Sequence, residues 1–329
     1  MEARLDHVSL FPADAVAGLF RRDLVEKLAA LRPSFLRFPG GCWVEGDTMK
    51  DAYRWKTTIG DRWNRRTQWN IWKYWSTSGV GFHEYLLLCE ALKAKPLFCI
   101  NVGMSHKETV PMDRMDEFVQ DALDCLEYCN GPVTSKWGAV RAAAGHPEPF
   151  GLAYLEIGNE NGGKAYEERY KLMADAVAAK HPGVTLVFDN WKETKSIGNG
   201  AKADLRDDHF YKTPDAFMAD LAHEYDAKKG DFGIFVGEYA VIKDTTRYGS
   251  LRGAIGAIVL KLVNCSEEPQ HVSIKGVSGA VSRTVFTGPG RDAHNSPAAP
   301  EALKEVSSDF ALDGSDTLPP LALVIYRTK

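Results

Sequence analysis

Short apolar runs alternate with helix-length segments between about residue 20 and residue 240, and this alternation constrains the fold more than any other feature. Six runs read as strands, at residues 35–38, 96–102, 152–157, 185–188, 208–211 and 234–236. In most of them apolar residues occupy both parities, as in parallel strands buried under helices on both faces. Helical periodicity predicts helices over residues 23–31, 82–92, 112–129, 166–180 and 213–229. The class is therefore α/β, either a barrel or a doubly wound sheet.

Polar side chains with useful chemistry follow nearly every predicted strand. They are Cys42, Asn101, Asn159, Glu160, Asn190, His209, Tyr211 and Glu238. A (β/α)₈ barrel gathers the carboxyl ends of all its strands around one site. A doubly wound sheet instead concentrates its chemistry at one switch point and usually carries a glycine-rich phosphate turn, which no strand here precedes. We therefore predict a TIM-type (β/α)₈ barrel, incomplete because the chain supplies about six strands.

The pattern changes after about Gly256. Residues 258–263, 272–274, 281–286 and 321–326 read as strands separated by Asn, Gly, Pro and Ser, with no helical period between them. Such spacing is typical of antiparallel structure. We expect a barrel domain over residues 1–256 and a small antiparallel β-sandwich-like domain over residues 257–329.

Composition excludes several functions. The net charge is −4 with no basic run, which argues against nucleic acid as a partner. No apolar run approaches the ~20 residues that span a bilayer, and the first residues lack a signal core, so a cytoplasmic location is expected. The six cysteines form no Cys-x-x-Cys pair. His209 follows two aspartates but has no second histidine cluster beside it, so no metal site is predicted.

Glu160 and Glu238 are the candidate catalytic pair. Each alone has an ordinary explanation, since an acid at a helix N-terminus or in a salt bridge is common. Together they meet the need of retaining glycosidases for two carboxylic groups ~5–5.5 Å apart, with environments that separate their pKa values. Strand order favours Glu160 as acid/base and Glu238 as nucleophile, although spacing does not decide this. His209 and Tyr211 share one face of a strand and are candidates to position a sugar; a buried structural histidine is the alternative.

Five of the eight tryptophans lie between Trp55 and Trp75. Aromatic faces line sugar-binding clefts, but they also fill hydrophobic cores. The sequence leaves both interpretations of this segment open.

Five ordered motifs resemble glycoside hydrolase family 51, which is chiefly α-L-arabinofuranosidases. They are Phe-Leu-Arg-Phe-Pro-Gly-Gly-Cys (35–42), the tryptophan-rich stretch through 69–72, Leu-Glu-Ile-Gly-Asn-Glu-Asn (155–161), Asp-Asp-His-Phe-Tyr (207–211) and Phe-Val-Gly-Glu-Tyr-Ala (235–240). The resemblance implies a barrel with an appended β-sandwich that hydrolyses terminal α-L-arabinofuranosyl groups with retention, on arabinose-containing oligosaccharides or polysaccharides and without a cofactor. It implies Glu160 as acid/base and Glu238 as nucleophile. It also implies that Cys42, Asn159, His209 and Tyr211 line the sugar subsite.

The chain also departs from this family. The resemblance implies a first barrel strand before His7 and an eighth strand after Gly256, and neither is found in the sequence. Two open sheet edges would result, and open edges invite pairing, so a homo-oligomer is one expected state. Two alternatives to an active arabinofuranosidase therefore stay open. One is an inactive fragment that retains sugar or partner binding, and the other is a barrel glycosidase of different specificity, such as an endoglucanase or xylosidase.

Overall fold

The computed structural model describes residues 10–189, 191, 200–212, 232–241, 259–264, 266–290 and 302–328. The chain divides into two compact units. The first comprises the described residues up to His209 together with residues 232–238, and the second comprises residues 210–212 and the described residues from Tyr239 onward. The expected boundary near residue 256, the expected helix over 213–229 and Asn190 lie outside the described residues.

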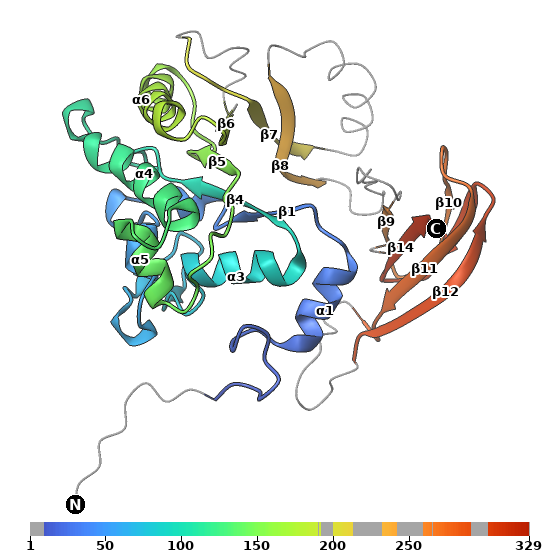
Figure 1. The fold of residues 1–329 in the computed structure, drawn as a ribbon. Coiled ribbons are helices and arrows are strands. Elements are labelled where there is room, and N and C mark those ends of the chain that lie inside the picture. Colours follow the sequence, from blue (N-terminus) through green and yellow to red (C-terminus); the bar gives the residue numbers. More distant parts are fainter. Residues whose placement is uncertain are drawn as a thin grey trace, which may run out of the picture. The chain divides into compact units, whose positions relative to one another are not determined.

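A six-stranded parallel sheet with covering helices forms the incomplete barrel that the sequence predicted (Figure 1). Its strands, in spatial order, are β1 (Phe35–Phe38), β4 (Lys95–Ile100), β5 (Tyr154–Ile157), β6 (Thr185–Asp189), β7 (Leu205–Lys212) and β8 (Gly233–Val241). The register is in step along the sheet, with Phe38 opposite Phe98 and Ile100 opposite Ile157. All six predicted strands are confirmed.

The sheet curls strongly. Across a flat sheet, β1 and β8 would lie about 24 Å apart, five strand spacings of about 4.8 Å. Instead, the rings of Phe35 on β1 and Phe235 on β8 meet at a centroid distance of 5.4 Å. The two end strands therefore face each other across the barrel interior, so their polar side chains can share one site.

The helices cover the outer face of this sheet. They are α1 (Arg22–Ala30), α3 (Phe82–Leu92), α4 (Asp116–Asn130), α5 (Lys136–Ala143) and α6 (Lys164–Lys180). Helix α3 packs on β1 and β4, α6 packs on β5, and α4 contacts both α5 and α6 (Figure 1). One core of fully buried side chains, among them Phe82, Phe98 and Leu155, fills the space between these helices and the sheet. Of these five helices, α5 was not predicted; its first turn is capped by Ser135, which accepts a hydrogen bond from Gly138 N.

The segment between β1 and α3 is irregular. It contains α2 (Cys42–Glu45) and the hairpin of β2 (Gln68–Trp69) and β3 (Trp75–Ser76). It also contains three 3₁₀ turns, at Met49–Asp51, Trp55–Thr58 and Arg62–Asn64. Outside this segment, a fourth 3₁₀ turn, Met112–Arg114, precedes α4. The tryptophans of this stretch differ in exposure. Trp55 is 1% exposed and belongs to the core, whereas Trp72 is 54% exposed and Trp75 is 64% exposed.

The described part of the second unit is antiparallel. A four-stranded sheet has the order β12 (Lys304–Leu312), β11 (Gly279–Thr287), β14 (Ala322–Thr328) and β9 (Val259–Asn264), and β10 (Gln270–Ser273) pairs with β13 (Ser315–Leu318). Side chains of both sheets share one apolar core, including Leu262, Val272 and Leu318. The expected antiparallel sheets thus follow the parallel one, although β12 and β13 were not predicted.

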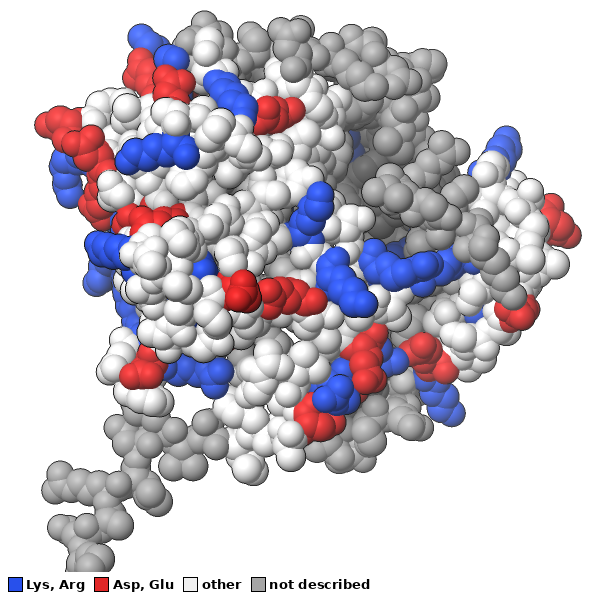
Figure 2. Space-filling model, viewed as in Figure 1, with Lys and Arg blue, Asp and Glu red and all other residues white. Residues whose placement is uncertain are grey.

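Among the helices that the structure describes, none has the length and apolar character needed to cross a membrane. Basic and acidic side chains lie interspersed on the face that Figure 2 shows, and neither sign covers it alone.

Candidate active site

Arg37 connects the two ends of the curled sheet. Its guanidinium donates two parallel hydrogen bonds of 2.7 Å to the Glu156 carboxylate on β5, and Nη2 also donates to Asn159 Oδ1 at 2.7 Å. Nη1 reaches Glu238 Oε1 on β8 at 3.1 Å. Paired, bidentate contacts of this kind fix geometry as well as charge. Sequence reasoning missed Arg37, although a charged residue inside the apolar run Phe-Leu-Arg-Phe was the available signal.

The structure brings Glu160 and Glu238 together around His209. His209 Nδ1 lies 2.8 Å from Glu160 Oε1 and 3.7 Å from Glu238 Oε2. One oxygen of each carboxylate and a ring nitrogen of the histidine all lie within 4.8 Å of one another. Retaining glycosidases hold their two carboxyl groups ~5–5.5 Å apart, whereas inverting enzymes separate them by roughly 6.5–9.5 Å. The close approach of these oxygens is compatible with the retaining arrangement.

Glu160 leaves β5 in an unusual backbone conformation. Its φ is +50°, a left-handed value that non-glycine residues adopt rarely. Such conformations cost free energy and are concentrated at functional sites. Here the conformation accompanies a carboxylate directed at the histidine rather than away from the sheet.

His209 is held in its charged form. Its Nε2 lies 3.0 Å from Asp207 Oδ2, and Asp207 also accepts a 2.6 Å hydrogen bond from the backbone N–H of Gly237. Burial by itself would lower the pKa of His209, but its hydrogen bonds to Asp207 and Glu160 and the charge of Glu238 outweigh this effect and raise the pKa to about 10. The imidazolium therefore donates from both nitrogens, one toward each carboxylate.

A buried acidic group lies beneath this pair. Burial raises the pKa of Glu156 to about 6, although Arg37 opposes the shift. Asp189, at the end of β6, is 1% exposed, and neither of its oxygens has a hydrogen-bond partner among the described residues. Burial, reinforced by the charges of Glu156 and Asp207, raises the pKa of Asp189 well above its ordinary range, which favours the neutral form of this side chain.

Cys42 and Asn159, both predicted to line the sugar subsite, flank Glu160. Cys42 Sγ lies 3.9 Å from Glu160 Oε2, and burial, together with the charges of Glu45 and the two paired carboxylates, raises the pKa of its thiol to about 12. The Asn159 side chain is fully buried and donates to Glu45 Oε2 at 3.0 Å. Asn161 donates to the other Glu45 oxygen at 3.2 Å. Both amides thus fix the walls of the site.

Of the other predicted residues, Tyr211 is exposed and Asn101 is buried. Tyr211 lies two residues beyond His209 on β7 and is 42% exposed. Asn101 is buried, and its side chain donates to the carbonyl oxygens of Val44 and Met104, so it organises a loop.

Three groups of side chains place potential metal-ligating atoms within 4.8 Å of one another. They are Cys42 with Glu45 and His106, Glu160 with His209 and Glu238, and Glu156 with Asp189 and Asp207. The absence of a metal stays a prediction. The five described cysteines are free thiols, four of them buried.

The family model described as the alpha-L-arabinofuranosidase 1 domain matches residues 27–230. The chain belongs to the α-L-arabinofuranosidase family, glycoside hydrolase family 51. Alpha-L-arabinofuranosidase 2 of Arabidopsis thaliana is 38% identical over 275 residues, which cover 82% of this chain and 40% of that protein. The extracellular exo-alpha-L-arabinofuranosidase of Streptomyces chartreusis is 38% identical over 271 residues, which cover 72% and 32% of the two chains. The chain thus spans about two-fifths of the length of such relatives.

Solved structures of the family share the fold. An arabinose-bound family 51 arabinofuranosidase, MgGH51, has a TM-score of 0.68 and 22% identity, covering 93% of this chain and 66% of that one. The family 51 enzyme of Thermotoga petrophila has a TM-score of 0.59 and 16% identity, covering 97% and 92%.

Proposed function

We propose that this chain carries the catalytic centre of a retaining glycoside hydrolase that removes terminal α-L-arabinofuranosyl groups from arabinose-containing oligosaccharides or polysaccharides. The observation that carries the proposal is the carboxylate pair, Glu160 and Glu238, with oxygens within 4.8 Å across one histidine. Family membership supports the choice of sugar, and the solved relatives include arabinose-bound structures.

Glu238 is the nucleophile in this proposal. Its Oε1 is held by Arg37, which leaves Oε2 to attack the anomeric carbon. The bond to the leaving oxygen breaks, and an arabinosyl ester forms on Glu238. Water then attacks the same carbon from the face that the leaving group vacated, so the two displacements retain the configuration.

Glu160 is the acid/base. It donates a proton to the leaving oxygen in the first step and takes one from the attacking water in the second. His209 is its immediate proton-bearing neighbour, at 2.8 Å, and Asp207 fixes the ring from the other side. We infer that His209 and Asp207 position the Glu160 carboxyl group for these two proton transfers.

The direct test is turnover of an aryl α-L-arabinofuranoside by the purified chain. Release of arabinose is expected, with kcat reduced at least about 10³-fold by Glu238→Gln, since the removal of an activated nucleophile has effects of this size. Glu26→Gln, an exposed carboxylate on α1, is the matched control and should be without effect.

Aryl xylosides and glucosides in the same assay separate this function from a xylosidase or endoglucanase. Well-folded protein that binds arabinose but turns over no glycoside would instead support the inactive alternative and contradict the proposal.

A further inference from the structure

A thiol, a carboxylate and an imidazole meet where α2 contacts the loop that follows β4. One potential ligand atom from each of Cys42, Glu45 and His106 lies within 4.8 Å of the other two. Cys42 and Glu45 are three positions apart on α2, so they share one face of that helical turn. His106 is far from both in the sequence, and only the fold brings it beside them.

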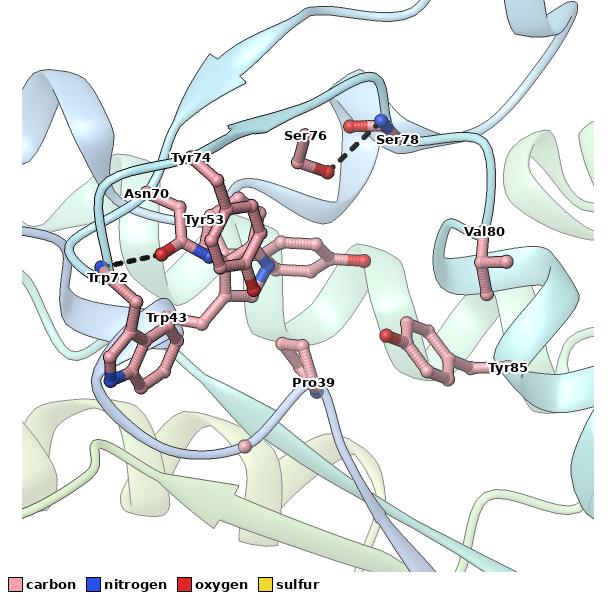
Figure 3. A pocket seen from close by; sticks show the side chains of 11 residues that line it. Pro39, Trp43, Tyr53, Asn70, Trp72, Tyr74, Ser76, Ser78, Val80 and Tyr85 are labelled. Atoms are coloured by element: carbon pink, nitrogen blue, oxygen red, sulfur yellow. Dashed lines mark hydrogen bonds between the residues drawn. The ribbon is translucent and has the colours of Figure 1, made fainter. Parts of the chain in front are cut away.

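The next residue of α2 points elsewhere and anchors the turn. Trp43 packs on Tyr53 at a ring-centroid distance of 6.2 Å, and both line an aromatic hollow beside the turn after β1 (Figure 3). Neither Cys42 nor Glu45 lines that hollow. The face of α2 that carries the thiol and the carboxylate is therefore separate from the hollow.

The loop that carries His106 is fastened to α2. The backbone N–H of His106 donates to Gly46 O at 3.1 Å. The side chain of Asn101, just after β4, donates to Val44 O at 2.9 Å. These contacts hold the imidazole beside the thiol and the carboxylate, so a ligand that bridges the three groups meets little ordering cost.

The Glu45 carboxylate is oriented by two amides and is 4% exposed. Asn159 donates to Oε2 at 3.0 Å, and Asn161 donates to Oε1 at 3.2 Å. Such partners orient a metal-ligating carboxylate and leave lone pairs on both oxygens. His106 Nε2 lies 3.4 Å from Oε2, beyond the roughly 2.7–3.2 Å of an ordinary N–H···O hydrogen bond. A nitrogen and an oxygen that each lie about 2.1 Å from a tetrahedral zinc ion are separated by about 3.4 Å.

The three donor atoms favour zinc over harder cations. Zn²⁺ accepts thiolate sulfur, imidazole nitrogen and carboxylate oxygen, whereas Mg²⁺ and Ca²⁺ prefer oxygen alone. Three protein ligands leave a fourth tetrahedral position open. The side chain of His106 is 35% exposed, so an ion can enter from solvent. The other two groups of potential ligands among the described residues contain no thiol.

We propose that Cys42, Glu45 and His106 bind Zn²⁺ and that the bound ion reversibly inhibits the active site. The thiol releases its proton to solvent as the zinc–sulfur bond forms. Cys42 Sγ lies 3.9 Å from Oε2 of Glu160, the proposed acid/base, so a cation on this sulfur competes with substrate for that carboxylate. Zinc is an inhibitor here and not a cofactor. The inhibition rests on the proposed function, whereas the binding of zinc does not.

Zinc binding is measured first, without substrate. Isothermal titration calorimetry with ZnCl₂ should show one site, which His106→Gln weakens at least about tenfold, because even the loss of a group that orients a ligand costs about 10–100-fold in metal affinity. His146→Gln is the matched control. His146 Nε2 also pairs with a carboxylate, that of Glu90 at 3.0 Å, but this pair belongs to none of the three groups of potential ligands.

A second probe reports on the thiol. Co²⁺ in place of Zn²⁺ should give a near-ultraviolet charge-transfer band from thiolate to cobalt. Cys42→Ser should abolish this band, and His146→Gln should keep it.

Turnover of an aryl α-L-arabinofuranoside then tests the inhibition. Zn²⁺ should raise the apparent KM with little change in kcat, and EDTA should reverse the effect. Relative to its own zinc-free rate, His106→Gln should need at least about tenfold more zinc for half-inhibition, whereas His146→Gln should stay within about twofold of the unmodified chain. Mg²⁺ at the same concentration should have no effect.

Three results would overturn the metal site: no zinc binding in calorimetry, equal weakening by His106→Gln and His146→Gln, or a cobalt band that persists in Cys42→Ser. Zinc bound by an active chain whose turnover stays unchanged would overturn the inhibition. A chain that binds zinc as expected but cleaves no arabinofuranoside would support the metal site and contradict the proposed function, so the two failures are distinguishable.

Discussion

Nδ1 of His209 lies 2.8 Å from Oε1 of Glu160, which makes the histidine a charged neighbour of the proposed acid/base. The contact joins β7 to the end of β5, two strands that are not adjacent in the sheet. It therefore depends on the curl of the sheet, and several properties of the chain should depend on it in turn.

The first prediction concerns stability at alkaline pH. The folded-state pKa of His209 is raised from 6.5 to about 10, so its stabilising contribution is fully present below about pH 6.5 and is lost as pH rises toward 10. Urea denaturation at pH 6.5, 8 and 9.5 should show a falling free energy of unfolding, by an amount on the order of a few kcal/mol.

The control is His209→Asn, which lacks the titrating group. Its stability should fall less over the same range, and the difference between the two proteins isolates the contribution of His209 from that of the other groups of the chain. Parallel curves for the two proteins would show that the histidine is not held in its charged form.

Arg37→Lys should keep a positive charge and still be damaging. Lysine cannot reproduce the two 2.7 Å bonds to Glu156 while also reaching Glu238, so one buried carboxylate loses its partner. We expect a loss of about 3–5 kcal/mol in stability and a fall in kcat of at least roughly tenfold. Chemical denaturation measures the loss of stability, and steady-state kinetics measure the loss of kcat. A fully active, fully stable Arg37→Lys protein would contradict the role assigned to the paired hydrogen bonds of the Arg37 guanidinium.

Asp189→Asn should be tolerated, unlike most substitutions of a buried acid. Burial raises the pKa of Asp189 well above its ordinary range, which favours the neutral form, so we expect an amide of the same shape to replace it at little cost. The expected change in free energy of unfolding is within about 1 kcal/mol. Asp207→Asn is the comparison, because Asp207 pairs with His209 and should lose markedly more. A larger loss for Asp189→Asn would mean that the carboxylate is ionised.

Gly158→Ala should disrupt the backbone between the end of β5 and Glu160. Gly158 has φ +99°, and a Cβ there would lie 2.6 Å from Asp189 Oδ2 and 2.7 Å from Asn161 Oδ1. We expect a loss of about 2–4 kcal/mol, combining backbone strain with steric clash, and reduced turnover. Gly183→Ala is the matched control, since no atom lies within 4 Å of its Cβ position and its φ is not left-handed. Thermal denaturation of both variants measures this difference in stability, and equal stability of the two variants would contradict the prediction.

Sequence patterns predicted the barrel well because its inner strands, such as β4 and β6, are buried on both faces and therefore carry apolar runs. Strand β12 escaped prediction for the opposite reason. It pairs only with β11 among the described strands, and most of its residues are exposed and polar, so it has no apolar period. The β2–β3 hairpin is two residues long on each side and too short to produce a pattern.

The site was predictable as a set of strand ends and not as a network. Glu160, Glu238, His209 and Cys42 could be named because polar residues rarely follow apolar strands without a reason. Arg37, Glu156 and Asp207 lie within strands, and their roles arise from contacts between residues more than 100 positions apart in the case of Arg37 and Glu156. Neither periodicity nor local composition encodes such a contact.

The proposed roles of Glu160 as acid/base and Glu238 as nucleophile are tested most directly by trapping the covalent intermediate. Glu160→Ala with an aryl α-L-arabinofuranoside should still undergo the first displacement, because a good leaving group needs no acid, and should stall before hydrolysis, because no base activates water. Peptide mass spectrometry of the stalled protein should find one arabinosyl unit esterified to Glu238. A burst of aryl alcohol with no adduct, or an adduct on any other residue, would contradict the account.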